Sequence, residues 1–392
     1  MKKRIILPVL ISIFSAASLL AENVITMKTQ RSSGEKIQLQ YDAEGPVEVV
    51  GAENPVYDES GRYVYTLTGN EISITGDLNY LFCPDNNIVN LDISRNTLLT
   101  NLDCSNNNLT AVDVTANVNL LSLNCANNQI KVLNIKQNTN LGTLNIANNQ
   151  LEAIDLTANK MLTVLTVTGN MLNTLDVSNN ISLLRVYCEQ NQLTELDFST
   201  NTKMKKLYCG KNPLTILNVS KNKALEYLSY SGSDPEIDIS LLSNLTTLDC
   251  TGGNITSLDV GKNTKLKQLR CYLNNISGEE MDKLISSLPD RSSMGAMGNF
   301  FVHNNVDGLE KNVCTNTQVE AAKKRGWTAR TWNGTNWIAY EGTESSDIES
   351  QLTDDAEVAN IYNMQGCRIP ELQKGMNIVR RNDGNISKVL KR

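Results

Sequence analysis

One position recurs every 21 residues through the middle of this 392-residue chain. Counted from Cys83, the frame reaches ten positions, with a one-residue deletion after the eighth. These ladder positions are Cys83, Cys104, Cys125, Ile146, Val167, Cys188, Cys209, Tyr230, Cys250 and Cys271. A fixed period of about 20 to 30 residues is typical of a solenoid, in which each repeat buries its apolar face only against its neighbours. The chain is therefore predicted to be a repeat array.

The residues around each ladder position are equally regular. One repeat follows L-x-x-L-x-C-x-x-N-x-L at Leu99, Leu102, Cys104, Asn107 and Leu109, and a nested half-repeat continues through Leu109, Val112, Val114 and Asn117. This pattern resembles the leucine-rich repeat. Its nesting within 21 residues is similar to the short leucine-rich repeats of secreted bacterial proteins of the Bacteroidetes type. The resemblance covers roughly residues 78 to 276.

The alternation in L-x-C predicts a strand with one buried face, stacked in parallel on its copy in the next turn. We call each such strand a rung. Ten rungs at about 4.8 Å give a body roughly 45 to 50 Å long. Prolines are few in the array and no ten-residue amphipathic stretch interrupts it, so we expect the return path to be a second short strand rather than a helix. The predicted fold class is a mainly β solenoid of about ten turns.

Two polar columns accompany the ladder. The asparagine column is expected to be structural, because an amide can both donate to and accept from exposed peptide groups. Its members are Asn86, Asn107, Asn128, Asn149, Asn170, Asn191 and Asn212. Stacked carboxylates in the second column repel one another unless they are solvated, hydrogen-bonded or shared by a cation, so local backbone bonding and calcium binding both stay open. That column comprises Asp92, Asp113, Asn134, Asp155, Asp176, Asp197, Asn218, Asp238 and Asp259.

Nine cysteines in an exported chain would ordinarily suggest disulfides. Seven of them share the ladder position with Ile146, Val167 and Tyr230, which predicts an interior slot occupied by free, buried thiols. Zinc needs converging ligands and the chain has only one histidine, His303, so no metal or other cofactor is expected. Cys314 and Cys367 lie outside the ladder, and a bridge between them stays open.

The N-terminus has the layout of a secretory signal peptide. Three basic residues precede an apolar run from Ile5 to about Leu20, which is short for a transmembrane span. We assign residues 1–21 to the signal peptide, with cleavage between Ala17 and Glu22, and no cysteine for a lipid anchor lies there. No later stretch is predicted to cross a bilayer. The mature protein is expected to be secreted, or to reside at the cell surface or in the periplasm.

Other segments are predicted to flank the array. Residues 22–77 consist of short strand-like segments separated by turn residues, which predicts a β cap. Residues 277–341 form an α/β cap with one helix capped by Ser277, a second near Thr317–Lys324, and tryptophans on short strands as its core. Those tryptophans are Trp327, Trp332 and Trp337. Residues 342–356 are an acidic linker, and residues 357–392 are a β-rich tail with a turn at Asn382–Gly384. The tail resembles the end of the C-terminal sorting modules of Bacteroidetes; a small β appendage is the alternative.

The sequence gives little support for a catalytic or a nucleic-acid-binding function. His303 has no serine or cysteine partner in a recognisable pattern, phosphate-binding glycine motifs are absent, and the acidic residues are spread by the repeat. The formal net charge of −6 and the lack of a dominant basic patch disfavour nucleic acid. The sequence thus predicts a protein that is not an enzyme.

Solenoids bind partners along the outward residues of their sheet. In this frame these residues stand three before, one before and one after each ladder position. Over the first five rungs they are mostly small or amide residues, such as Asn101 and Ser122. Over the next five they become aromatic and charged, and we expect ligand contacts at Arg185, Tyr187, Lys206, Tyr208, Tyr227, Arg270 and Tyr272.

Tyrosine and arginine often dominate binding energy at protein interfaces, and tyrosine rings also suit the flat faces of sugars. The alternative is that these tyrosines only pack across adjacent strands and shield the sheet. If the L-D-V half-repeats formed the main sheet instead, the aspartate column would be the binding face. We expect a monomeric, surface-exposed protein that binds or adheres to a protein or glycan; the alternative is a structural spacer or assembly protein of the bacterial envelope.

Overall fold

The computed structural model describes residues 23–306, 308–344, 358–363, 368–369, 375–381 and 386–391. The predicted signal peptide and most of the predicted linker lie outside the described residues. Within the described residues, no helix has the length and apolar character needed to cross a membrane.

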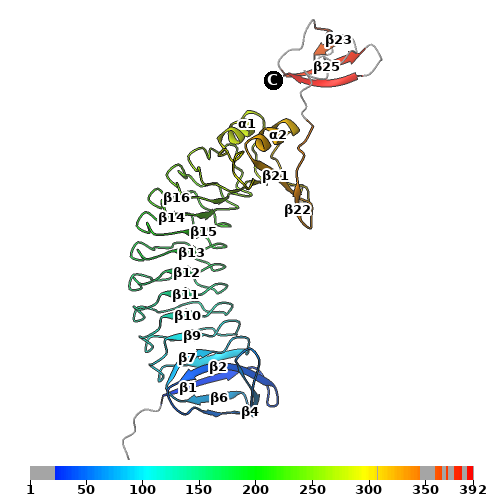
Figure 1. The fold of residues 1–392 in the computed structure, drawn as a ribbon. Coiled ribbons are helices and arrows are strands. Elements are labelled where there is room, and N and C mark those ends of the chain that lie inside the picture. The colour runs from blue at the N-terminus through cyan, green and yellow to red at the C-terminus, as the bar shows by residue number, and fades with distance from the viewer. Residues whose placement is uncertain are drawn as a thin grey trace, which may run out of the picture.

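A long parallel sheet runs through the molecule (Figure 1). Each of its rungs directly precedes a ladder position. The rungs pair in steps of one repeat, as in the alignment of Leu102 with Leu123 and of Leu123 with Leu144. The ten strands are β7 (Leu78–Phe82), β9 (Asn101–Asp103), β10 (Ser122–Asn124), β11 (Thr143–Asn145), β12 (Val164–Thr166), β13 (Arg185–Tyr187), β15 (Lys206–Tyr208), β17 (Tyr227–Ser229), β18 (Thr247–Asp249) and β19 (Gln268–Arg270). They bound nine turns, and the predicted solenoid is confirmed.

The interior of each turn is filled by leucines and by the ladder residue. Every ladder cysteine is fully buried and free, as predicted. Burial raises the pKa of these thiols, to about 12 for Cys125, because the thiolate would lose its hydration. Cys314 is also a free, buried thiol, whereas Cys367 lies outside the described residues.

The asparagine column joins successive turns as the sequence predicts. The amide nitrogen of Asn107 donates to the carbonyls of Cys83 (3.0 Å) and Cys104 (2.9 Å). Its Oδ1 accepts from the backbone nitrogens of Asn86 (3.1 Å) and Ile88 (2.9 Å). Because these peptide groups are buried, a side chain without both functions would leave some of them unsatisfied.

The return path differs from the expectation. Within the described part of the array, a second strand forms only at β8 (Ile88–Asp92), β14 (Glu195–Asp197) and β16 (Ile216–Asn218). In most other turns neighbouring return segments share a single backbone bond, such as Gln129 N to Leu109 O at 2.8 Å. One shared bond does not make a ladder, and the same side-chain-capped turn follows the segments that form strands and those that do not.

A further regularity is a left-handed residue two positions after each ladder residue. This place has a φ between +50° and +80° throughout, for example 54° at Asn106, 69° at Gly169 and 57° at Leu273. Asparagine and glycine tolerate this conformation better than other residues, which explains their recurrence there.

The N-terminal cap is built from two antiparallel groups of strands. In one, β3 (Glu48–Val50), β6 (Glu71–Thr75), β1 (Val24–Thr29) and β8 lie side by side. In the other, β4 (Ala52–Tyr57), β5 (Tyr63–Leu67) and β2 (Lys36–Ala43) extend the long sheet through the antiparallel pairing of β2 with β7. The cap thereby covers the first turn of the solenoid.

At the other end the parallel sheet continues beyond Ile276. It adds β20 (Gly298–Asn304) and β21 (Trp327–Trp332), and the hairpin strand β22 (Trp337–Ala339) closes it. The helices α1 (Gly278–Ser287) and α2 (Asn316–Lys324) precede β20 and β21, so they take the place of the return path. Asn312 continues the asparagine column by donating to Cys271 O (2.8 Å) and Val302 O (3.0 Å). Val302 therefore occupies an eleventh ladder position.

Two details of the C-terminal cap depart from expectation. Ser277 holds the N-cap position of α1, but its side chain makes no capping hydrogen bond. Thr315 of α2 has the full capping box with Gln318. Among the tryptophans only Trp327 is a fully buried core residue; Trp332 and Trp337 are half-buried and meet other aromatic rings at the surface.

The C-terminal tail contains a four-stranded antiparallel sheet of its own. Its strands are β23 (Val358–Asn363), β24 (Arg368–Ile369), β25 (Gly375–Arg381) and β26 (Ile386–Lys391). The predicted turn at Asn382–Gly384 lies outside the described residues, between the paired strands β25 and β26.

Candidate functional site

The outward face of the long sheet carries three rows of side chains. The strands settle which half-repeat forms this face, because the residues around the ladder build the long sheet and the L-D-V segments do not. On β13, Arg185 and Tyr187 stand outward with Glu189 just beyond the strand, while Val186 is buried between them. On β15, Lys206 and Tyr208 repeat the arrangement in direct register.

Three of the predicted tyrosines form one continuous stack. Tyr187 and Tyr208 are register partners, with ring centroids 4.8 Å apart and planes 17° apart. Tyr227 lies on the other face of the Tyr208 ring, at 4.3 Å and 23°. It reaches there diagonally, because its own register partner is Lys206. We call these three residues the tyrosine stack.

The geometry of the stack limits what it can bind. Its rings lie face to face, so Tyr208 has a neighbouring ring against each face. A sugar that packs on an aromatic side chain needs a free ring face. The stack instead offers ring edges and hydroxyls to a ligand, which suits the mixed polar and apolar surface of a protein.

Arg270 and Tyr272 belong to a second aromatic cluster. The Arg270 guanidinium carbon lies 4.9 Å from the Phe301 ring centroid, and Tyr272 meets Trp337 edge-on at 4.9 Å. Trp337 also contacts Phe301 at 4.9 Å, so strand β22 folds beside this end of the face. The positive charge of Arg270 lowers the pKa of the Tyr208 and Tyr227 hydroxyls, against the larger effect of burial.

Charge is distributed unevenly around the tyrosine stack. Arg185 and Lys206 are adjacent cations in register, and neither forms an ion pair with a described residue. On the opposite side of the stack, Glu189 is half-buried and accepts from Thr168 Oγ1 at 3.2 Å. Burial raises the pKa of Glu189, and the negative charge of Asp249 acts in the same direction. The stack thus has two cations on one side and a single carboxylate on the other.

Burial also raises the pKa of the stacked hydroxyls. For both Tyr208 and Tyr227 the loss of hydration is the main cause. These hydroxyls remain neutral donors and acceptors at any physiological pH, which is what hydrogen bonding to a partner requires.

The first five rungs present a different surface. A shallow depression of about 250 Å³ lies over the small and amide side chains there, bordered by Phe82. The row is internally bonded, since Asn124 Nδ2 donates to Asp103 Oδ2 at 2.8 Å and Ser105 Oγ donates to Asp103 Oδ1 at 2.6 Å. Its polar groups therefore satisfy one another.

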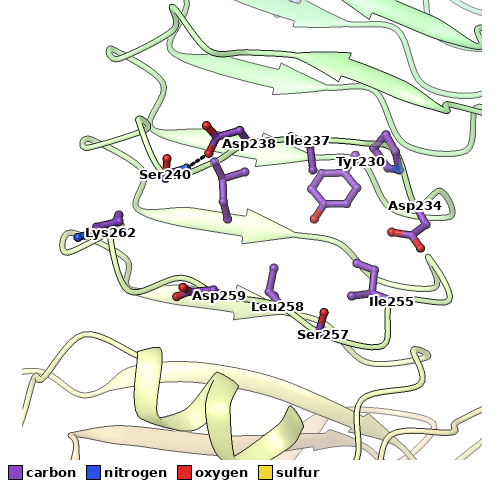
Figure 2. Close-up of a pocket in the computed structure, with 12 residues that line it drawn as sticks. Tyr230, Asp234, Ile237, Asp238, Ser240, Ile255, Ser257, Leu258, Asp259 and Lys262 are labelled. Atoms are coloured by element: carbon purple, nitrogen blue, oxygen red, sulfur yellow. Dashed lines mark hydrogen bonds between the residues drawn. The ribbon is translucent and has the colours of Figure 1, made fainter.

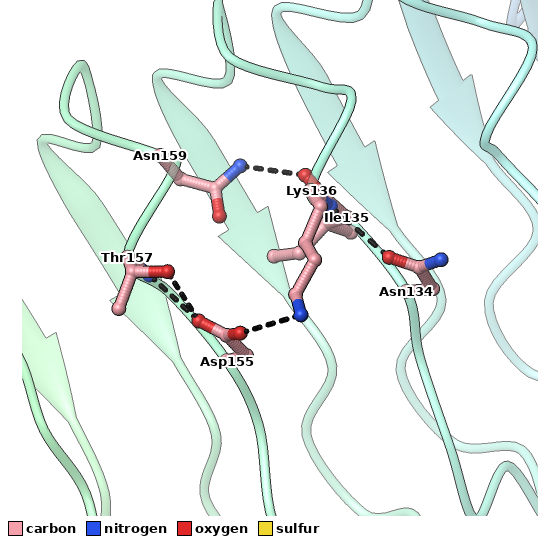
Figure 3. Close-up of polar contacts among 6 residues, drawn as sticks. All are labelled: Asn134, Ile135, Lys136, Asp155, Thr157 and Asn159. Carbon is pink, nitrogen blue, oxygen red and sulfur yellow. Dashed lines mark hydrogen bonds and ion pairs between the residues drawn. The ribbon is translucent and has the colours of Figure 1, made fainter.

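The aspartate column is engaged in local turns. Asp155 Oδ1 accepts from the nitrogen (3.0 Å) and hydroxyl (2.6 Å) of Thr157, and Asp155 Oδ2 pairs with Lys136 Nζ at 3.1 Å (Figure 3). These bonds lower the pKa of Asp155 to about 2. Where the column holds Asn134, its Oδ1 accepts from Lys136 N at 3.2 Å in the same way. Among the described residues, no group of three potential metal ligands converges.

His303 is placed for packing. Its ring stacks on Tyr340 at 4.6 Å and 9°, and Nδ1 lies 3.1 Å from Thr331 Oγ1. Burial lowers its pKa, which favours the neutral imidazole.

The parallel sheet, the leucine and cysteine interior and the asparagine column together define a leucine-rich repeat solenoid. Among solved structures, the functional domain of InlJ from Listeria monocytogenes, which includes a cysteine ladder, matches with a TM-score of 0.51 at 21% identity, over 83% of this chain and 93% of that one. This likeness concerns the fold. Neither a family model nor a curated protein sequence matches the chain.

Two further likenesses are weaker. The internalin InlF from Listeria monocytogenes matches with a TM-score of 0.43 at 16% identity, over 66% of this chain and 87% of that one. The receptor TLR13, in a complex with the RNA ssRNA13, matches with a TM-score of 0.45 at 16% identity, over 63% of this chain and 42% of that one.

Sequence reasoning missed three features of the site. The diagonal contact of Tyr208 with Tyr227 depends on side-chain rotamers that the repeat frame does not specify. Phe301 and Trp337 of the second aromatic cluster lie beyond Ile276, where the 21-residue frame ends. The separation of charge along β13 was visible as the alternation Arg185, Tyr187, Glu189, which a search of each strand for outward charges would find.

Proposed function

We propose that this protein is a non-catalytic binding protein of the bacterial exterior, and that its ligand is a protein held on the sheet face around the tyrosine stack. The single observation that carries the proposal is the stack itself, flanked by unpaired cations on one side and by Glu189 on the other. Aromatic residues beside charges of both signs are typical of protein interfaces. A stable sheet does not need them, because the four rungs β9 to β12 form without any outward aromatic residue.

The geometry favours a protein over a glycan. Each ring of the tyrosine stack uses at least one face on its neighbour, so a sugar would find free faces only at the two ends. The cation row and the carboxylate lie on opposite edges of the stack, and a polypeptide can match both signs at once.

Export to the cell exterior is part of the proposal and rests on the N-terminal sequence. The basic residues and the short apolar run have the layout of a secretory signal peptide. Delivery by the C-terminal tail as a Bacteroidetes-type sorting module is the finer form of the same idea, supported by the tail's resemblance and its compact antiparallel sheet.

A binding screen separates a ligand-binding protein from an envelope spacer. The mature chain, residues 22–392, is immobilised and exposed to a panel of purified extracellular proteins and to a glycan array. We expect saturable binding to at least one protein and no saturable binding to glycans. Absence of saturable binding across both panels would contradict the proposal and favour the spacer.

A further inference from the structure

One pair of neighbouring turns lacks the backbone hydrogen bond that joins the return segments of the other pairs. Neighbouring return segments share at least one backbone hydrogen bond elsewhere, as in Gln129 N to Leu109 O (2.8 Å) and Asn275 N to Ile255 O (2.9 Å). Among the described residues, none joins segment 233–238 to segment 253–258. The backbones of these two segments are therefore not joined, and the turns are next linked beyond them, where Asn263 Nδ2 donates to Ile239 O at 2.8 Å.

The one-residue deletion causes this loss of backbone bonding. A parallel bridge aligns Glu236 with Ile216, so Asp234 stands where the previous repeat has the buried Leu214. Ser233 replaces the column asparagine of this repeat and bonds only its own turn, through Oγ to Tyr230 O at 2.7 Å. An inter-turn amide is thus missing here, and the buried side chain that follows Ser233 is the short ring of Pro235 rather than a leucine.

The missing amide and the shorter side chain leave a cleft of about 400 Å³ between the two return segments (Figure 2). Its middle is apolar, with Tyr230, Ile237, Ile255 and Leu258 along the two walls. Carboxylates stand at both ends: Asp234 at one, and Asp238 with Asp259 and the ammonium of Lys262 at the other. Carboxylates outnumber cations three to one in this lining.

One wall of the cleft also offers an unpaired strand edge. Glu236 bonds the preceding turn with both of its peptide groups, donating to Thr215 O at 2.8 Å and accepting from Leu217 N at 3.1 Å. Peptide groups of successive extended residues point in opposite directions, so the N–H and C=O of Ile237 point toward the cleft. No backbone partner among the described residues meets them.

We propose that this cleft binds an extended peptide segment of a partner protein with the side-chain pattern basic–x–apolar–x–basic. The apolar side chain enters the middle of the cleft, the two basic side chains meet the carboxylates at its ends, and the peptide backbone pairs with Ile237. Alternate residues of a strand point to the same side, which gives the spacing of the motif. The inference is independent of the proposed function, since the cleft lies on the return side and shares no residue with the tyrosine stack.

The test uses the mature chain with ¹³C-labelled isoleucine methyl groups. The probe is the synthetic peptide acetyl-Lys-Thr-Leu-Thr-Lys-amide, and the readout is the NMR shift of the Ile237, Ile239 and Ile255 methyls on titration. We expect saturable shifts at these three methyls. The peptide acetyl-Glu-Thr-Leu-Thr-Glu-amide should produce none, because its charges repel the cleft.

Matched variants assign the effect to the cleft. Asp238→Asn with Asp259→Asn should raise the Kd about fivefold, since each exposed ion pair contributes up to about 1 kcal/mol. Asp113→Asn with Asp176→Asn changes the same column elsewhere and should leave the Kd unchanged. Ser257→Trp, at the exposed mouth, should abolish binding while the methyl spectrum remains that of the folded protein.

The proposal is overturned by any of three results: no saturable shift with the lysine peptide, equal shifts with both peptides, or shifts that survive both Ser257→Trp and the Asp238/Asp259 pair. Shifts of the same methyls by Ca²⁺ alone, at concentrations that block the peptide, would also overturn it in favour of a cation site.

Discussion

Tyr208 stacks on Tyr227 at 4.3 Å, although the register partner of Tyr227 is Lys206. The contact is diagonal, so it joins two rows of the sheet face that would otherwise be independent. Aromatic pairs of this kind contribute roughly 0.5 to 1.5 kcal/mol beyond the area they bury. We therefore expect a coupling free energy in that range from a Tyr208→Ala and Tyr227→Ala double-mutant cycle, measured by urea unfolding.

The matched control for that cycle is the pair Tyr187 and Tyr227. They sit two rungs apart, about 9.6 Å by the usual strand spacing, with Tyr208 between them. Their coupling should stay within about 0.5 kcal/mol of zero. A Tyr208–Tyr227 coupling no larger than this control would show that the stack contributes nothing specific.

The asparagine column predicts a large loss of stability at single positions. Asn128 donates to the carbonyls of Cys104 (3.1 Å) and Cys125 (3.2 Å) and accepts from Leu109 N (2.9 Å). Asn128→Ala leaves the buried Leu109 N–H without its partner, whereas both carbonyls still accept from the neighbouring column asparagines, so the free energy of unfolding should fall by about 2 to 3 kcal/mol. Gln129→Ala, on the exposed surface of the same repeat, should change it by less than about 0.5 kcal/mol in the same urea experiment.

The buried thiols predict an alkaline loss of stability. Burial raises the pKa of Cys125 to about 12, whereas an unfolded thiol titrates near 8.5. Between these values the unfolded chain has lost a proton that the folded chain keeps. The stability contributed by this thiol is therefore complete below about pH 8.5 and falls by about 1.4 kcal/mol per pH unit as the pH rises toward 12.

Cys125→Val isolates that contribution, since valine already fills the ladder position at Val167. Urea unfolding between pH 8.5 and 10.5 should show a shallower decline for this variant, by about 1.4 kcal/mol per pH unit. Ile146→Val, which removes no thiol, should decline in parallel with the wild type. Identical slopes for Cys125→Val and the wild type would mean that the thiol ionises equally in both states.

The positions with left-handed backbone, two residues after each ladder residue, predict a stabilising substitution. Gln190 has a φ of 54° on the exposed surface, a conformation that costs a residue with a Cβ about 1 kcal/mol more than glycine. Gln190→Gly should raise the thermal midpoint. Gln192→Gly, two residues further where φ is not positive, should lower the thermal midpoint, because glycine there destabilises the fold by a similar free energy. A lower midpoint in both variants would refute the assignment of strain to Gln190.

Much of the fold could be predicted because each turn repeats the same physical problem. Cys104 and its equivalents exchange with Ile146 and Val167, which marks an interior slot, and Asn107 stands where peptide groups need both a donor and an acceptor. The eleventh rung was not predictable from the period. Val302 and Asn312 continue the columns, but a helix and a longer loop separate them from the frame.

The sites were harder to predict than the fold, because they arise where the repeat departs from its average. The deletion after Tyr230 was visible in the sequence, yet the cleft depends on which bonds the shortened segment fails to make. The tyrosines were likewise visible, whereas their face-to-face stacking, which disfavours a sugar platform, follows from side-chain geometry.

Selection from a displayed peptide and protein-domain library tests the central claim most directly. Binders are selected on the mature wild-type chain, and their Kd values are compared with those for Tyr187→Ser/Tyr208→Ser/Tyr227→Ser and for Tyr57→Ser, an exposed tyrosine of the N-terminal cap. We predict a dominant class of binders whose Kd rises about tenfold or more in the triple variant, as expected for loss of interface hot spots. Tyr57→Ser should leave the Kd unchanged. Binders that hold the triple variant as tightly as the wild type would contradict the assignment of the tyrosine stack as the binding site.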